Sequence, residues 1–153
     1  MSLWDHAAAL YARPGVEAAC LRLQDGEGQC VPLLLWRLWT IDEGRAIDAG
    51  TLERATALAR AWTAAAVAPL RRTRRRLKTP FAPVEDAARL ALRAQVAASE
   101  LAAERMLLDA LEALTPRKNA VGAGVDRLTA LRALGPRGRK PASEAALRTL
   151  TGS

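Results

Sequence analysis

The spacing of apolar and polar positions divides the first forty residues into three short helical segments. Residues 3–12 follow Ser2, a good N-cap residue, and stop before Pro14, which disfavours helical backbone in the residue that precedes it. Residues 16–24 place four apolar side chains on one helix face. A third helix begins near Val31, with Pro32 in its first turn, and ends near residues 42–44. This helix is apolar nearly all round, which is typical of the middle of a bundle.

Two longer segments follow and predict an antiparallel helix pair. We expect Thr51 to cap a helix over residues 52–78, which Pro69 should kink or break. The second long helix should span residues 84–114, about 45 Å at 1.5 Å per residue. The short connection around Phe81 makes the two helices antiparallel neighbours. The apolar stripe of the second helix is spaced like a coiled-coil seam and comprises Leu90, Ala94, Ala97, Leu101, Glu104, Leu108 and Leu111.

The apolar periodicity ends at Leu114, after which glycine and proline interrupt the chain. Two short helices are expected, over residues 125–134 and 143–150. We therefore predict a helical domain over residues 1–114 and a basic tail over residues 115–153, partly disordered or with short helices. The fold class is all-α: an irregular helical bundle, with three short N-terminal helices packed on the long antiparallel pair.

Composition and charge narrow the class of protein. Half of the 153 residues are apolar, mostly alanine and leucine, which favours helix over strand. No apolar run approaches the roughly 20 residues of a membrane helix, and the N-terminus does not read as a signal peptide. We therefore expect a cytoplasmic protein that does not bind membranes. The net charge of +7 is uneven, because residues 1–114 hold 15 basic and 14 acidic side chains and residues 115–153 hold 8 and 2.

Metal and nucleophilic chemistry find little support. The only cysteines are Cys20 and Cys30, and His6 is the only histidine, which leaves too few nitrogen and sulfur ligands for a zinc site. Two buried free thiols are the simplest interpretation, and a disulfide or redox pair is the alternative. His6 has no partner that the sequence reveals for a role as general base. We expect no metal, no cofactor and no catalytic residue.

Two carboxylates in the last long helix are the first candidate site. Glu104 occupies the apolar seam, and Glu100 lies one turn before it. Because an unpaired buried charge is costly, the carboxylates should pair with a cation, for which Arg60 or Arg37 is suitably placed. A polar pocket that binds a small ligand is the alternative. A di-metal centre is disfavoured, because no Glu-x-x-His pair is present.

An arginine-rich run is the second candidate site. It spans residues 70–78, and we expect it to be a solvated helix end in which residues 74–76 lie near Glu85 and Asp86 and are partly paired with them. Contact with the phosphates of nucleic acid is the alternative. Taken with the carboxylates, the candidate binding residues are Glu100, Glu104, Arg60, Arg71, Arg72, Arg74, Arg75 and Lys78.

Several motifs resemble those of a family of small helical proteobacterial proteins known as a domain of unknown function. The resemblance spans about residues 3–114 and is carried by Leu3-Trp4-Asp5, Leu10-Tyr11-Ala12-Arg13-Pro14-Gly15-Val16, Cys20-Leu21, Leu23-Gln24-Asp25, Leu33-Leu34-Leu35 with Trp39, Pro69-Leu70-Arg71, Arg74-Arg75-Arg76-Leu77-Lys78 and Glu100-Leu101-Ala102-Ala103-Glu104-Arg105. It implies a compact all-helical protein and no particular activity.

Three functions from different classes remain open. The first is an interaction or adaptor protein without catalytic activity, which binds an unidentified protein or forms a homodimer. The second is a nucleic-acid-associated accessory protein that binds phosphates through the arginine-rich run and the basic tail, weakly and without sequence specificity. The third is a ligand-binding regulator or enzyme that uses a Glu100/Glu104 pocket. An exposed apolar patch would favour the interaction protein. A continuous positive face would favour the nucleic-acid-associated protein, and a polar cavity would favour the ligand-binding regulator or enzyme.

Overall fold

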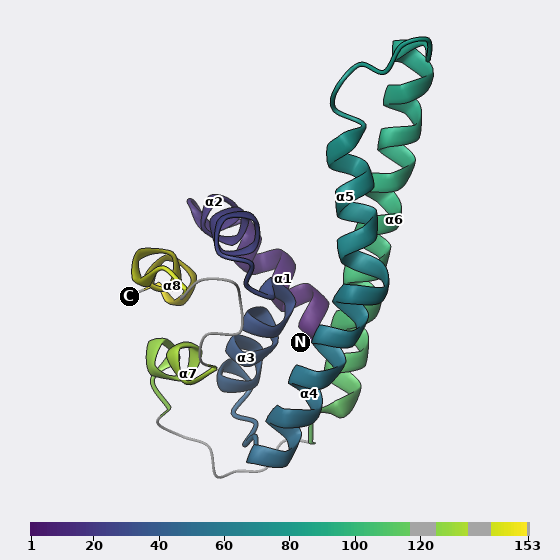
Figure 1. Cartoon of the computed structure of the whole chain (residues 1–153). Helices are drawn as coiled ribbons and strands as arrows, with labels where there is room; N and C mark the ends of the chain where they lie inside the picture. The colour runs from purple at the N-terminus through teal and green to yellow at the C-terminus, as the bar shows by residue number, and fades with distance from the viewer. Residues whose placement is uncertain (117–124, 135–141, 153) are drawn as a thin grey trace.

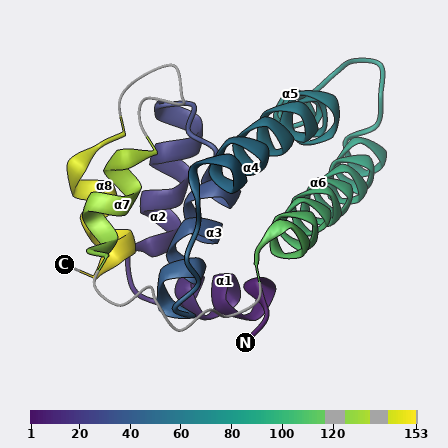
Figure 2. The ribbon, with the colours of Figure 1, turned by 90° about the horizontal axis from the view of Figure 1, so that it is seen from below.

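Helix α3 (Val31–Asp42) forms the centre of this computed structural model, which describes residues 1–116, 125–134 and 142–152. Helices α1 (Leu3–Tyr11), α4 (Ala49–Trp62), α6 (Asp86–Leu114) and α7 (Arg127–Ala133) contact it from different sides (Figure 2). The position follows from its composition, because a helix without a polar face is stable only when it is surrounded. Its buried side chains include Leu33, Leu34, Leu35, Trp36, Leu38 and Trp39.

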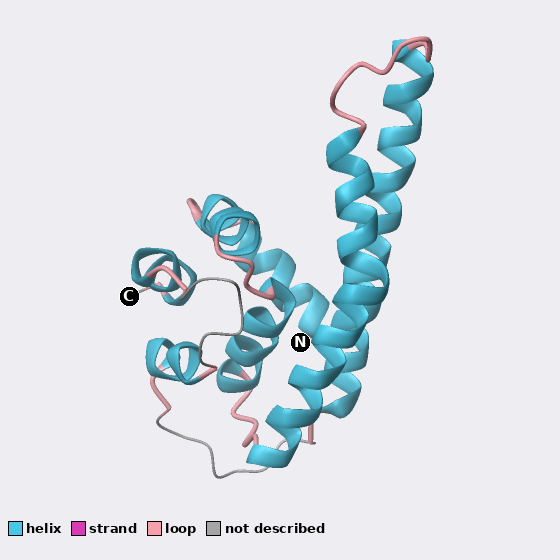
Figure 3. Ribbon diagram, in the orientation of Figure 1, coloured by secondary structure: helices cyan, strands magenta, loops and turns pink. Residues whose placement is uncertain are grey.

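Every regular element in the described residues is helical, as the all-α prediction requires (Figure 3). Helix α2 (Val16–Leu21) continues into a π-helical turn (Arg22–Gly26), so the predicted second helix is present with a wider last turn. Helix α8 (Glu144–Thr151) completes the body of the molecule. None of the described helices has the length and hydropathy that crossing a bilayer requires.

Helix starts follow local side-chain chemistry. Ser2 caps α1 by accepting a hydrogen bond from the backbone N–H of Asp5 at 3.1 Å. The expected cap of the fourth helix was wrong: Asp48 accepts from the Thr51 N–H at 2.6 Å, and Thr51 is buried inside the first turn. The three-residue spacing fits an N-cap aspartate better than a cap at Thr51 itself.

The long antiparallel pair is a hairpin that projects from the body (Figure 1). Its first arm comprises α4, a π-helical turn (Thr63–Val67) and α5 (Ala68–Arg76), and α6 is the second arm. The π-helical turn lies just before Pro69, where the ring removes a backbone donor, and the arm continues past the proline instead of breaking. Trp62 Nε1 donates to the Ala103 carbonyl at 2.8 Å, which fixes the register of the arms.

The predicted seam of α6 is only half right. Leu108 and Leu111 are buried, but Leu90 and Leu101 are about half exposed. The reason is that the buried face of α6, which runs through Arg89, Glu100 and Leu107, lies one position to the side of the predicted stripe, so that Leu90 and Leu101 fall at its exposed edge. The buried residues of α6 are Arg89, Glu100, Ala103, Leu107, Leu108 and Leu111.

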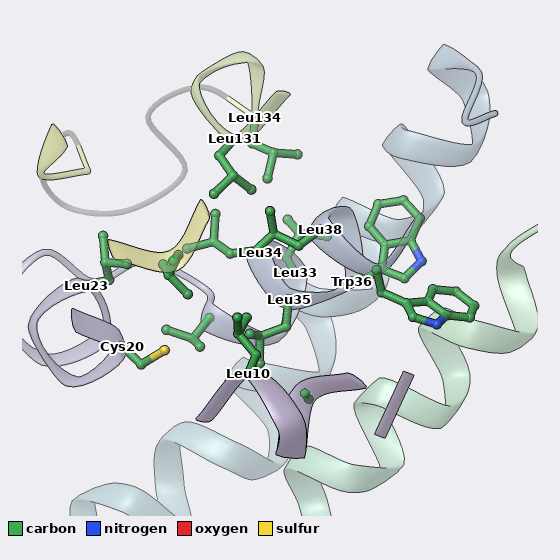
Figure 4. Packing of buried hydrophobic residues seen from close by; sticks show 14 of the residues in the cluster. Leu10, Cys20, Leu23, Leu33, Leu34, Leu35, Trp36, Leu38, Leu131 and Leu134 are labelled. Carbon is green, nitrogen blue, oxygen red and sulfur yellow. The ribbon is translucent and has the colours of Figure 1, made fainter. Parts of the chain in front are cut away.

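The segment after Leu114 forms the two short helices, and both join the core. Helix α7 packs on α3, and α8 packs on α2. Figure 4 shows Leu131 of α7 and Leu134, the residue that follows the helix, facing the leucines of α3. The described part of the tail is therefore continuous with the body, and the core does not end at Leu114. The expected disorder of the rest of the tail falls on residues 117–124 and 135–141, outside the described residues. The buried residues of α7 and α8 include Leu128, Leu131, Ala146, Leu147 and Leu150.

Candidate functional site

Two carboxylates of α6 and two arginines of α5 form one ion-pair cluster inside the hairpin. Arg71 donates from Nε to Glu100 Oε1 at 2.8 Å and from Nη2 to Glu104 Oε1 at 2.7 Å. Arg74 also donates to Glu100, through Nε to Oε2. The Glu100 side chain is 8% exposed and that of Glu104 is 27% exposed. Glu100 is therefore the buried centre of the cluster, and Glu104 lies at its partly exposed edge.

The two carboxylates differ in their electrostatics. Burial pushes the pKa of Glu100 upward, but hydrogen bonds from Arg74 and Arg71 outweigh it, so the pKa lies below its usual value. For Glu104, burial dominates, and the charge of Glu100 adds to it, so the pKa is raised even though Arg71 opposes the shift. The negative charge of Glu104 is therefore less well neutralised by neighbouring positive charges than that of Glu100.

The expected partners of these carboxylates were wrong. Arg60 is exposed and lines a surface depression with Leu52 and Thr56, and Arg37 donates to Thr40 Oγ1 at 3.2 Å. Trp62, two residues after Arg60, lies beside this part of α6, where its Nε1 donates to the Ala103 carbonyl. The helical spacing did not predict the rotation of α4 about its own axis, which turns Arg60 toward solvent.

The arginine-rich run divides into paired and unpaired side chains. Arg71 and Arg74 belong to the cluster, and Arg75 pairs with Asp25. Within the described residues, Arg72, Arg76 and Lys78 are exposed and have no carboxylate within ion-pair distance. Half of the run is thus structural, and half is available to a partner.

The expected pairing of residues 74–76 with Glu85 and Asp86 is absent from the ion pairs of the described hairpin. Asp86 instead pairs with Arg89, one turn later on α6, at 2.9 Å. The Arg89 guanidinium also donates to the carbonyls of Leu77 and, at 3.1 Å, Lys78. Arg89 therefore satisfies the C-terminal carbonyls of α5, and it is buried in doing so.

A pocket of about 270 Å³ lies between α1, α3 and α6, next to the cluster. Glu104 contributes to its wall, and Glu100 does not, so the expected Glu100/Glu104 pocket is in fact a Glu104 pocket. The sequence-based prediction did not include the α1 residues of this pocket, Trp4, Ala7, Ala8 and Tyr11. Their spacing of three and four could have shown that they share one face of the helix. The lining residues are Trp4, Ala7, Ala8, Tyr11, Gln24, Val31, Pro32, Leu35, Leu101, Glu104 and Leu108.

The tip of the hairpin carries a second hollow of about 820 Å³, between the end of α5 and the start of α6. Its apolar lining includes Leu77, Phe81, Val84 and Leu92. Phe81 is 70% exposed, and Val84 and Leu92 are about half exposed. Arg76 lies at the same hollow, so the tip combines apolar surface with positive charge.

The remaining candidate groups have structural partners. His6 Nε2 lies 2.8 Å from Asp42 Oδ2, and Arg127 Nε donates to Asp42 Oδ1 at 2.8 Å, which ties α7 to the body. Both cysteines are free thiols, Cys20 buried and Cys30 half-buried. The described residues contain no group of three histidine, cysteine or acidic side chains that could hold a metal ion.

Comparisons with known proteins place the chain in a family without assigning an activity to it. No curated protein and no solved structure matches it. Residues 2–111 match a family model, and this range includes the ion-pair cluster, the hairpin tip and the whole lining of the Glu104 pocket. The match covers well over half of the chain, which therefore belongs to the family described as "Protein of unknown function (DUF2390)".

Proposed function

We propose that this protein is a cytoplasmic interaction protein that presents the tip of its α5–α6 hairpin to an acidic partner protein and has no catalytic activity. The observation that carries the proposal is the tip hollow, where large apolar side chains are exposed beside the unpaired Arg76. Exposed apolar surface rimmed by polar residues marks interaction sites on soluble proteins.

Phe81 is the natural anchor of this surface. Its aromatic ring is the most exposed of the large apolar side chains in the described residues. Buried aromatic anchors supply a large share of the binding energy in protein interfaces. Val84 and Leu92 line the same hollow and would surround the anchor with apolar contacts.

The charge of the hairpin argues for an acidic partner. Residues 68–100 hold eight basic and three acidic side chains. Arg72, Arg76 and Lys78 are exposed and free of ion pairs within the described residues, so they could pair with carboxylates of a partner. A second copy docking tip to tip would bring like charges together, which disfavours the homodimer.

Nucleic acid fits the same surface less well. Three residues of the arginine-rich run already pair with carboxylates, and phosphates would leave the apolar hollow unused. The free thiols, Cys20 and Cys30, support the cytoplasmic part of the proposal, because disulfides are rare in that compartment.

Affinity purification with matched variants tests the proposal. The tagged protein is purified from cells that encode it, with and without nuclease, as wild type, Phe81→Ser and Leu21→Ser. Leu21 is 49% exposed on α2 and does not line the tip hollow, so its variant controls for the loss of any exposed apolar side chain.

The proposal expects an acidic protein that is recovered with wild type and Leu21→Ser, survives nuclease and is lost with Phe81→Ser. Purified, that protein should bind Phe81→Ser at least about tenfold more weakly than wild type, as expected of an anchor. Equal recovery with all three baits, recovery that nuclease abolishes, or self-association in place of a partner would contradict it.

A further inference from the structure

We propose that the pocket between α1, α3 and α6 binds a small apolar amine, whose ammonium group donates to Glu104. The proposal is independent of the hairpin tip, because the pocket and the tip hollow share no lining residue. It assigns to the pocket a ligand class defined by two features, an apolar body and one positively charged head.

The walls of the pocket select the apolar body. Trp4 and Tyr11 of α1 contribute aromatic rings, and Leu35, Leu101 and Leu108 add aliphatic side chains from α3 and α6. A cavity of about 270 Å³ is slightly smaller than the roughly 300 Å³ at which pockets for drug-sized molecules begin. The ligand is therefore small, of the size of one aromatic ring with a short side chain.

Glu104 selects the head group. Its Oε1 accepts from Arg71 at 2.7 Å, whereas Oε2 has no hydrogen-bond partner within the described residues. Arg71 pairs with both carboxylates, whereas Arg74 pairs only with Glu100. Glu104 therefore has fewer positively charged partners than Glu100. An ammonium group has three N–H donors and one positive charge, and it would satisfy both the free oxygen and the charge.

The other polar groups of the pocket are compatible with this head. Gln24 lines the pocket and offers a side-chain amide, whose one contact in the described residues is a long hydrogen bond to Asp25, at 3.4 Å. Tyr11 also lines the pocket, and burial raises the pKa of its hydroxyl, which therefore stays neutral. Burial is the main reason that the pKa of Glu104 is raised, and a bound cation would reverse that effect.

Arg105 is a positive group beside one wall of the pocket. Its guanidinium lies over the Trp4 ring, 4.8 Å from the centroid, and the residue is exposed. Solvent screens an exposed guanidinium, but it would attract an anionic ligand. A carboxylate analogue of the amine is therefore the informative competitor.

A matched set of three probes tests the head group: 2-phenylethylamine, 2-phenylethanol and phenylacetate. Each is titrated into the full-length chain while ¹H–¹⁵N NMR follows the Trp4 indole N–H. We expect the amine to bind with a Kd on the order of 1 mM, the alcohol at least about tenfold more weakly and the carboxylate more weakly still.

Three variants test the location. Ala8→Leu fills the pocket from an exposed position of α1, and Ala9→Leu is its control, because Ala9 is exposed on the same helix and does not line the pocket. Glu104→Gln keeps an oxygen that can accept from Arg71 and removes the charge. Ala8→Leu should weaken amine binding about tenfold or more, and Ala9→Leu should leave it unchanged.

Glu104→Gln should reduce the affinity for the amine to that for the alcohol and leave the alcohol unaffected. The proposal is overturned if wild type binds none of the probes at about 10 mM. It is also overturned if amine and alcohol bind equally, if phenylacetate binds best, or if Ala8→Leu binds the amine as wild type does.

Discussion

Arg71 Nη2 donates to Glu104 Oε1 at 2.7 Å, although the two residues are 33 positions apart in the chain. The contact joins the two arms of the hairpin at the point where it leaves the body. Glu104 also lines the pocket between α1, α3 and α6. The same side chain therefore belongs both to the ion-pair cluster and to the wall of the pocket.

Removal of Glu100 should destabilise the protein more than removal of Glu104. Glu100→Ala leaves Arg74 without its carboxylate and Arg71 with one fewer, and should lower the free energy of unfolding by about 2–4 kcal/mol. Glu104→Ala should cost less, because its side chain is more exposed and pairs with one arginine. Urea denaturation measures both, with Glu53→Ala at an exposed position as control. A larger loss for Glu104→Ala would contradict the assignment of Glu100 as the centre.

The two carboxylates should affect stability with opposite pH dependence. The pKa of Glu100 is lowered in the fold, so its contribution is present above the unfolded pKa of about 4.3 and is lost as pH falls through the folded pKa. The pKa of Glu104 is raised, so its contribution is present below about 4.3 and is lost as pH rises through the folded pKa.

The measurement is the free energy of unfolding of wild type, Glu100→Gln and Glu104→Gln against pH. With rising pH, the advantage of wild type over Glu100→Gln should grow, and its advantage over Glu104→Gln should shrink. Parallel curves for the two variants would show that the two carboxylates share one environment.

The C-terminal helices should be needed for full stability. Leu131 of α7 is buried against α3, so Leu131→Ala should cost about 2–4 kcal/mol, whereas Leu90→Ala at a half-exposed position should cost much less. A chain that ends after Thr115 should lose most of its cooperative thermal transition, because α2 and α3 then expose the surface that α7 and α8 cover. If the truncated chain melts at the same temperature as wild type, the helical domain ends at Leu114, as the sequence pattern predicts, and the C-terminal helices are not needed for its stability.

Any binding to nucleic acid should be weak and should depend on the unpaired part of the arginine-rich run. Neutralising Arg72, Arg76 and Lys78 together should reduce the slope of log affinity against log salt by about 3, one unit per phosphate contact. Fluorescence anisotropy with labelled DNA and RNA at several salt concentrations measures the slope. An unchanged slope would assign such binding to another part of the chain.

Local signals in the sequence were sufficient for much of the fold. The cap at Ser2, the helix stop at Pro14 and the apolar composition of α3 each depend on neighbouring residues, and the structure agrees with them. The antiparallel pairing of the two long helices could also be predicted, because the connection near Phe81 is short. These features need no information about which face of a helix meets its neighbour.

The sequence did not show how each helix is rotated about its own axis. It also did not show which side chains pair across long distances in the chain. The buried face of α6 runs through Arg89, Glu100 and Leu107, one position to the side of the stripe that the apolar spacing predicts. Asp42 reaches both His6 and Arg127, and no spacing in the sequence connects the three. The docking of α7 had a usable signal in Leu128 and Leu131, which are three residues apart and would have nothing to cover in a free tail.

Photo-crosslinking from the hairpin tip is the most direct test of the proposed function. A photoreactive phenylalanine analogue replaces Phe81 in one chain and Leu21 in another, and both are irradiated in growing cells. We predict that the chain labelled at position 81 crosslinks to one acidic protein and that the chain labelled at position 21 does not. Crosslinks from position 81 to nucleic acid, to a second copy or to nothing, with the chain folded, would contradict the account.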